Sequence, residues 1–302
     1  MDGARPVLPK YVDIFQNYFH DYDKKSWFNF APFLISYHLP PNRRLEFVEE
    51  DSTLFIYQIT RSATDNSQSR IDLFTSPCPL SAFSVNKLSD VAKCNGQSNI
   101  RILWTDQKDL EGLQSLFGHK IEATFKDEEY IYDPRLIFEA NGSRYKDLRK
   151  KTRRVEKLKP VFRELRVDDL PEAYKLLKEW RRVQGRKRDF LLDWGYTNSA
   201  LERQFQIGSD NIFSWCVEID NCLQGFAMAG PISKEVASFF IIKTNLRIDG
   251  LSEYLRWKVC GELQGFKYLN DAGDLCLPGL RQHKVKMRPI GFNKVSSVKL
   301  FL

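Results

Sequence analysis

The chain has 302 residues, of which 42% are hydrophobic and 13% aromatic, a composition that excludes an intrinsically disordered protein. A chain of this length is expected to fold as two domains. The formal net charge of +7 favours anionic partners such as nucleic acid, anionic lipid or a phosphate-bearing cofactor, although a mildly basic balance is also ordinary for folded proteins.

Cysteine and histidine are too dispersed to predict a metal site. The six cysteines include no CxxC pair and the four histidines stand alone, so free thiols in a reducing compartment are expected. The N-terminus "MDGARPVLPKYVDIF" lacks a signal-peptide pattern, and no apolar run approaches the roughly 18 residues of a membrane span. These features predict a cytoplasmic protein with no transmembrane segment, for which peripheral membrane contact stays open.

Residues 1–125 are predicted to form a first domain of mixed helices and strands. Apolar alternation marks the strands, polar loops separate them, and Gly118 stops a helix. The expected elements are a helix and turn at 18–37, strands at 54–60 and 70–75, a helix at 80–93, a strand at 100–105, a helix at 106–118 and a strand at 119–125.

Residues 126–302 are predicted to form a second domain, entered through a bridge at 126–133. Its element order is broadly similar to that of the first domain, without a repeat at the level of residues. After a basic segment, the expected elements are a strand at 161–166, a helix at 167–185, a short helix at 198–208, two strands within 211–232, a strand at 235–245, a helix at 251–265, a strand at 267–270, a short helix at 279–286 and a final strand.

The basic segment "GSRYKDLRKKTRRVEKLKP" has the spacing of an amphipathic helix. From Arg144 to Arg163, ten of twenty residues are Lys or Arg, against two acids. The ordered alternation of charged and apolar positions argues against a disordered tail. The predicted apolar stripe consists of Tyr145, Leu148, Thr152, Val155 and Leu158.

The charged faces of this helix are predicted to contact phosphates. So many like charges on one helix repel one another unless they are solvated or meet an anion. A merely solvated helix face is the alternative. The candidate residues for binding tRNA or other phosphates are Arg144, Lys146, Arg149, Lys150 and Arg153.

Three stretches together resemble a known family. They are "NGSRYKDLRKKTRRVEKL", "CVEIDNCLQGFAMAG" and "YLNDAGDLCLPGLRQHKVKMRP", in that order. This order is similar to that of the C-terminal domain of phosphatidylglycerol lysyltransferases and their free-standing relatives, over about Tyr130 to Pro289. The chain departs from the family pattern where Ala272 or Gly273 and Cys276 stand in the last stretch, which puts an acid of the family's site in question.

The resemblance implies two GNAT (acyl-CoA N-acyltransferase-like) folds in tandem. Each would be a mixed, mostly antiparallel sheet flanked by helices, within the α/β (α+β) class. In the lysyltransferases the donor is an aminoacyl-tRNA and the acceptor is a lipid headgroup, and Fem-type aminoacyltransferases use a similar fold and the same donor class. The resemblance therefore implies a reaction class more securely than a substrate.

Near the end of the chain the resemblance implies a transfer site. Asp274 would orient the α-amine of the donor or act as a base, and Asn270 would hydrogen-bond the substrate. Arg281 and Lys284 are spaced i, i+3 on one helix and would bind a phosphate or carboxylate of the donor. Helix capping by Asp274, strand termination at Asn270 and solvation of the two cations are the structural alternatives.

The segment "RIDGLS" is a second candidate for donor binding. Arg247, Gly250 and Ser252 fit the frame with which GNAT enzymes hold the pyrophosphate of acetyl-CoA at a helix N-terminus. Such a turn could equally hold the phosphates of a tRNA end. An ordinary strand-to-helix turn with one glycine is the alternative.

Three functions remain open from these observations. The first is an aminoacyl-tRNA-dependent aminoacyltransferase that acts on an amine or hydroxyl of a small molecule, peptide or lipid, with no tightly bound cofactor. The second is an acyl-CoA-dependent N-acetyltransferase, and the third is a non-catalytic RNA- or anion-binding protein. The chain has no GxSxG motif and no obvious Cys/His pair, as direct transfer from an activated ester would allow.

Overall fold

The computed structural model describes residues 3–41, 43–61, 69–94, 96–184 and 189–301. The strands are β1 (Arg5–Pro6), β2 (Arg44–Glu50), β3 (Thr53–Arg61), β4 (Ser69–Thr75), β5 (Asn99–Asp106), β6 (Ile121–Tyr132), β7 (Val161–Glu164), β8 (Phe213–Ile219), β9 (Cys222–Pro231), β10 (Val236–Thr244), β11 (Tyr268–Asn270) and β12 (Gly291–Phe301). The α-helices are α1 (Val12–Asp21), α2 (Ala31–Tyr37), α3 (Ala82–Cys94), α4 (Gln107–Phe117), α5 (Pro134–Glu139), α6 (Lys146–Glu156), α7 (Leu170–Gln184), α8 (Asp189–Ile207), α9 (Leu251–Glu262) and α10 (Pro278–Lys286).

All the described strands belong to one mixed sheet, in the order β1-β2-β3-β4-β5-β12-β6-β11-β10-β9-β8-β7. The pairs β4–β5 and β10–β11 are parallel, and the other pairs are antiparallel. Helix α3 connects the first parallel pair and α9 connects the second, so the two halves of the sheet repeat one arrangement. The predicted α/β (α+β) class, with a mostly antiparallel sheet flanked by helices, is confirmed.

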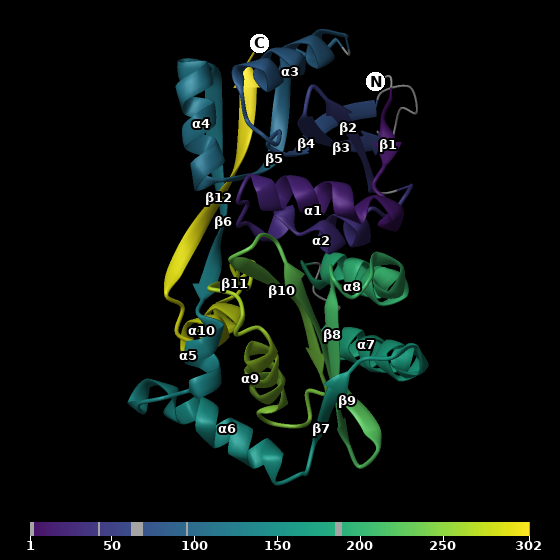
Figure 1. Cartoon of the computed structure of the whole chain (residues 1–302), viewed down its shortest axis with the longest axis vertical. Coiled ribbons are helices and arrows are strands. Elements are labelled where there is room, and N and C mark those ends of the chain that lie inside the picture. Colours follow the sequence, from purple (N-terminus) through teal and green to yellow (C-terminus); the bar gives the residue numbers. More distant parts are fainter. Residues whose placement is uncertain (1–2, 42, 62–68, 95, 185–188, 302) are drawn as a thin grey trace.

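The two long strands at the centre cross between the halves. β12, the last strand in the chain, pairs with β5 of the first half, and β6 pairs with β11 of the second half. β6 and β12 also pair with each other along most of their length (Figure 1). The C-terminal strand therefore completes the sheet of the N-terminal half.

Helices cover both faces of this sheet and enclose three apolar cores. One core joins α1, α2, α7 and α8 with both halves of the sheet, and it contains Phe15, Phe30, Phe33 and Phe226. α9 and α6 cover the other face of the second half, while α3 and α4 cover that of the first half. Because β10 is covered on both faces, its sequence "VASFFIIKT" is almost continuously apolar rather than alternating.

Several predicted boundaries differ from the structure. β2 was not predicted, and α8 begins at Asp189 rather than at residue 198. α6 ends at Glu156, so Leu158 lies beyond the helix and is 44% exposed, outside the predicted stripe. The predicted bridge 126–133 lies largely in β6, so the predicted domain boundary between residues 125 and 126 falls within one strand. That boundary stays a prediction.

None of the described helices combines the length and apolar character needed to cross a bilayer.

Candidate active site

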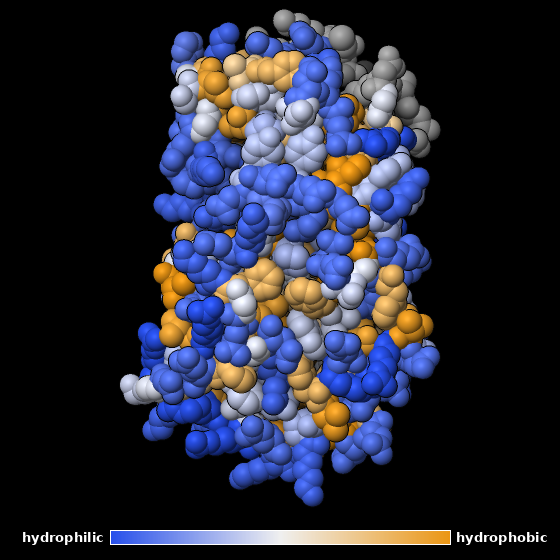
Figure 2. All heavy atoms as spheres, viewed as in Figure 1, coloured by the Kyte–Doolittle hydropathy of each residue, from blue (hydrophilic) through white to orange (hydrophobic). Residues whose placement is uncertain are grey.

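A pocket of about 310 Å³ lies where the two halves of the molecule meet. It opens where β10 and β11 separate, because these strands pair only over Val236 to Ser238 among the described residues. Figure 2 shows apolar side chains gathered near the middle of the face drawn, over β10 and β11. The lining residues with aromatic rings are Trp27, Phe33, Tyr37, Trp104, Trp180, Tyr196, Phe239 and Phe240.

Six of these rings, those of Trp27, Phe33, Tyr37, Trp104, Tyr196 and Phe240, contact one another and form a rigid wall. Phe33 and Tyr196 lie with their ring centroids 5.8 Å apart, and Tyr196 stacks on Phe240 at 5.7 Å. Trp27 contacts both Phe33 at 4.5 Å and Trp104 at 5.1 Å. Edge-to-face and offset contacts of this kind hold aromatic side chains in defined orientations. The wall therefore combines residues of the N-terminal half with residues of α8 and β10.

A buried ion pair lies at one side of the pocket. Lys243 Nζ on β10 lies 2.8 Å from Asp193 Oδ2 on α8, and the side chains are 7% and 14% exposed. Thr197 donates a hydrogen bond to Asp193 as well. The ammonium group of Lys243 lies 4.3 Å from the ring centroid of Trp180. The charges of Lys243 and Asp193 therefore balance each other.

A second charged group forms the floor of the pocket. Arg256 Nη1 on α9 lies 2.8 Å from Asp271 Oδ2, and Arg256 also covers the ring of Phe239 at 4.3 Å. The two side chains form an ion pair, but their angles do not meet the geometry of a hydrogen bond. Arg256 Nε is also buried, with no hydrogen-bond partner among the described residues. Lys284 on α10 donates to the carbonyl oxygens of Asp271 and Ala272. Burial lowers the pKa of the Lys284 ammonium, which shares this pocket floor.

Asp127 on β6 is the third carboxylate of the pocket lining. Its Oδ1 accepts a hydrogen bond from the backbone N–H of Glu128 at 2.8 Å, and no cation lies within ion-pair distance of it among the described residues. Burial raises the pKa of Asp127, and the neighbouring Asp274 adds to this effect. A carboxylate in this state can accept a proton or bind an ammonium group.

Two predicted catalytic residues have structural contacts. Asn270 is fully buried at the end of β11, where its Nδ2 donates to the carbonyl oxygen of Lys25 and its Oδ1 accepts from the N–H of Ala272. Asp274 accepts hydrogen bonds from the hydroxyl of Tyr130 at 2.6 Å and from the N–H of Cys276 at 2.9 Å. Neither residue is among those that line the pocket. Their catalytic roles stay predictions.

The structure separates the two cations predicted on the last helix. Lys284 is buried and lines the pocket, whereas Arg281 is exposed on α10. A spacing of three residues predicts that Arg281 and Lys284 lie on the same side of the helix. The buried strip of α10 is narrow, however, and includes Lys284 but not Arg281. Their binding roles stay predictions.

The predicted donor loop at the start of α9 lies against the basic helix α6. Gly250 has a φ of +88°, and a Cβ at this position would meet both the side chain and the carbonyl oxygen of Lys151 at 3.1 Å. Lys151 pairs with Glu253, and Arg154 pairs with Asp249. This helix N-terminus is therefore flanked by two carboxylates that α6 neutralises. Arg247 is exposed and Ser252 is half-buried there, and the donor-binding roles of Arg247, Gly250 and Ser252 stay predictions.

Helix α6 is amphipathic, with Leu148, Thr152 and Val155 on its buried face. Arg149 is half-buried and donates hydrogen bonds to the carbonyl oxygens of Ala140 and Gly142, next to the end of α5. The remaining phosphate-binding candidates Arg144, Lys146, Lys150 and Arg153 are exposed. The molecule's lower end, where α6 lies, is strongly hydrophilic (Figures 1 and 2).

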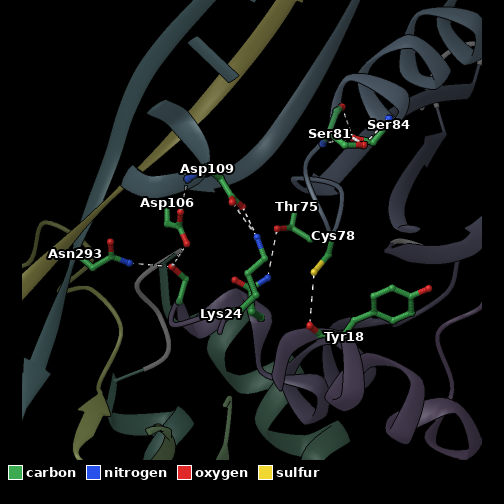
Figure 3. Close-up of polar contacts among 11 residues, drawn as sticks. Tyr18, Lys24, Thr75, Cys78, Ser81, Ser84, Asp106, Asp109 and Asn293 are labelled. Atoms are coloured by element: carbon green, nitrogen blue, oxygen red, sulfur yellow. Dashed lines mark hydrogen bonds and ion pairs between the residues drawn. The ribbon is translucent and has the colours of Figure 1, made fainter. Parts of the chain in front are cut away.

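A separate buried polar cluster connects the N-terminal segment to the rest of the sheet. Lys24 donates to both carboxylate oxygens of Asp109 at 2.7 and 2.8 Å, and Asp109 in turn donates its backbone N–H to Asp106 (Figure 3). Asn293 on β12 donates to the hydroxyl of Ser26, which lies beside Asp106 (Figure 3). These contacts hold the segment that carries Trp27 at the pocket wall.

Glu129 lies fully buried at the edge of this cluster. It accepts hydrogen bonds from the N–H of Trp27 at 2.8 Å and from the side chain of Asn293. Burial raises the pKa of Glu129 to about 8, because a carboxylate loses more solvation in the interior than these donors restore. The position of Trp27 in the pocket is therefore coupled to a titratable group.

Most of the residues that line the pocket were not predicted from the sequence as site residues. Lys243 had a usable signal, because it is a lone cation within an apolar strand and such a charge is buried only with a partner. Asp271 lies next to the predicted Asn270. Asp193 carried a similar signal, since it lies between Leu192 and Trp194 in an apolar stretch, whereas Asp127 and Arg256 have charged neighbours along the chain.

The family model described as phosphatidylglycerol lysyltransferase, C-terminal, matches residues 105–295. No curated protein matches the chain significantly. The fold is similar to that of a conserved protein of unknown function from Bacteroides thetaiotaomicron, with a TM-score of 0.84 and 16% identity over 99% of this chain and 100% of that one.

Two further solved structures share the fold at low identity. L-PGS from Bacillus licheniformis has a TM-score of 0.70 at 14% identity, over 99% of this chain and 93% of that one. FemX has a TM-score of 0.64 at 11% identity, over 96% of each chain. The resemblance drawn from the three sequence stretches is thus confirmed. Since the family model spans more than half of the 302 residues, the chain belongs to the phosphatidylglycerol lysyltransferase C-terminal family.

Proposed function

We propose that this protein transfers an aminoacyl group from tRNA to an amine or hydroxyl acceptor in the pocket between its two halves. Membership of the lysyltransferase family and the shared fold with L-PGS and FemX support this reaction class. The observation that carries the proposal is the arrangement of one pocket, in which Asp127, a carboxylate without a salt bridge among the described residues, lies with the cations Arg256 and Lys284.

The chemistry needs few groups because an aminoacyl ester is already activated. The acceptor attacks the ester carbonyl, a new C–N or C–O bond forms, and the bond to the 3′-terminal ribose oxygen of the tRNA breaks. The released ribose oxygen takes the proton that the acceptor loses, and Asp127 holds the α-ammonium group of the aminoacyl ester beside the reacting carbonyl. Arg256 and Lys284 stabilise the negative charge that develops on the carbonyl oxygen.

The surroundings of α9 favour tRNA over CoA as the donor. A pyrophosphate binds a helix N-terminus through free N–H groups and a positive field. At α9, the nearby cations Lys151 and Arg154 are already paired with Glu253 and Asp249, and Lys151 also packs against Gly250. The exposed cations of α6 instead suit an extended polyanion.

Salt-dependent binding of total charged tRNA, with CoA as a competitor, tests the proposal. Binding should weaken steeply with salt and ignore CoA. The triple variant Lys146→Gln, Lys150→Gln and Arg153→Gln should lower the slope of log affinity against log salt by about 2–3, since each phosphate contact contributes about 0.7–0.9. A matched control changes three exposed lysines elsewhere, Lys120, Lys175 and Lys178, to Gln and should leave the slope unchanged.

Two outcomes contradict the proposal. Displacement of the tRNA by CoA would indicate an acyl-CoA-dependent enzyme. An equal loss of slope in the control variant would indicate a general charge effect without a tRNA site on α6. Sequencing of the retained tRNA names the amino acid.

A further inference from the structure

The aromatic wall of the pocket already carries cations that belong to the protein. Lys243 lies 4.3 Å from the ring centroid of Trp180, and Lys126 lies 3.5 Å from that of Trp104. The guanidinium of Arg43 lies 4.7 Å from the ring centroid of Tyr37. Aromatic pockets bind cationic ligands through the faces of their rings. Lys243 lines the pocket, whereas Lys126 and Arg43 contact its rings without lining it. A ligand ammonium that binds the rings of Trp180, Trp104 or Tyr37 would therefore share each ring with a cation of the protein.

The carboxylates of the pocket are also mostly engaged. Asp193 is paired with Lys243, and Asp271 is paired with Arg256 at 2.8 Å and lies 3.7 Å from Lys284. Asp127 is the pocket carboxylate without an ion-pair partner among the described residues. The lining thus holds three carboxylates and three cations, and among the described residues Asp127 is its one carboxylate without a salt bridge. One added ammonium group can contact Asp127 directly, and a second would find no such partner in a largely apolar cavity.

An aminoacyl ester carries one positive charge on its α-amine, and lysyl or arginyl groups carry another on the side chain. We infer that the pocket selects an aminoacyl group with a neutral, apolar or aromatic side chain, whose α-ammonium binds Asp127 while its side chain packs on the aromatic wall. This inference rests on the proposed function, because it assumes an aminoacyl ligand. A volume of about 310 Å³ suits a group of this size and lies at the lower end of ligand pockets, about 300–1,000 Å³.

The inference is tested by calorimetric titration of the full chain with phenylalaninamide, leucinamide and lysinamide, in which an amide replaces the reactive ester. Phenylalaninamide or leucinamide should bind at least about tenfold more tightly than lysinamide, because the side-chain ammonium gains no partner. Equal or tighter binding of lysinamide overturns the inference. Failure of all three amides to bind also overturns it.

A variant tests the cause of the selectivity. Lys126→Gln removes the cation over Trp104 and should narrow the preference for phenylalaninamide over lysinamide by about threefold, the size of one exposed cation–π contact or charge repulsion. The control Lys120→Gln removes an exposed lysine of the same half and should leave the preference unchanged. An unaltered preference in Lys126→Gln contradicts the role assigned to ring-bound cations.

The amide titrations and the tRNA-binding experiment together distinguish a wrong side-chain selectivity from a wrong proposed function. Retention of lysyl-tRNA by the protein, together with tight lysinamide binding, would leave tRNA-dependent transfer standing and remove the neutral-side-chain selectivity. Selective binding of phenylalaninamide without any tRNA binding would retain the selectivity of the pocket and remove tRNA as the donor.

Discussion

The carboxylate of Asp127 lies directly against the α-carbon of Gly273. A Cβ built at Gly273 would come within 1.8 Å of Asp127 Oδ2 and 2.1 Å of its carboxyl carbon. Only glycine fits at this position while Asp127 keeps its place in the pocket. The loop that carries Gly273 thus makes room for a carboxylate that comes from β6.

Gly273→Ala is expected to displace Asp127 and to weaken the binding of phenylalaninamide at least about tenfold, since a charge-assisted contact is lost. Calorimetric titration measures this effect, and thermal unfolding checks that the variant is folded. Gly279→Ala is the matched control, because a Cβ at Gly279 has no heavy atom within 4 Å. Equal affinity in Gly273→Ala and the native protein would remove Asp127 from ligand binding.

Breaking the buried pair of Lys243 and Asp193 should destabilise the fold. Lys243→Met leaves Asp193 largely buried without its cation, and such changes cost about 3–5 kcal/mol in the free energy of unfolding. The double variant Lys243→Met with Asp193→Asn should recover part of this loss, because no unpaired charge remains. Urea denaturation of the two single variants and the double variant measures the coupling, and strict additivity would contradict a direct interaction.

The buried Glu129 should make stability depend on pH. Its pKa rises from an ordinary value of 4.5 to about 8 in the fold, so the folded state holds a proton that the unfolded state releases. Its stabilising contribution is present below about pH 4.5 and is lost as the pH rises through about 8. The difference in the free energy of unfolding between the native protein and Glu129→Gln should shrink or reverse over that window. A difference that is constant with pH would show that the fold does not raise the pKa of Glu129.

Removal of β12 should expose the N-terminal half of the sheet. β12 pairs with β5 along most of its length, and Val298 and Leu300 are fully buried against the core of the first half. After deletion of residues 291–302, amide hydrogens of β5 should exchange faster, while those of β9 remain protected. Deletion of residues 301–302 alone is the control. Unchanged protection of β5 would contradict its dependence on the C-terminal strand.

Much of the local structure was predictable because it depends on short-range patterns. The alternation of apolar residues predicted β3, β5 and β8–β10, and the 3.6-residue spacing predicted the amphipathic helix α6 with Leu148, Thr152 and Val155 buried. Leu158 was wrongly included, since the helix ends before it. Helix α8 was truncated in the prediction, so the side chains it contributes to the pocket were missed.

The sequence by itself determined the class of fold, most of its helices and strands, the cationic face of α6 and the family to which the chain belongs. Tertiary structure decided which residues meet: the exchange of β6 and β12 between the halves, the pocket at the separation of β10 and β11, and the ion pairs within it. Asp127 and Gly273 lie far apart in the chain, as do Lys243 and Asp193. Periodicity reports which face of an element is buried, whereas the partner of a buried charge depends on which elements pack together, and that follows from long-range pairing alone.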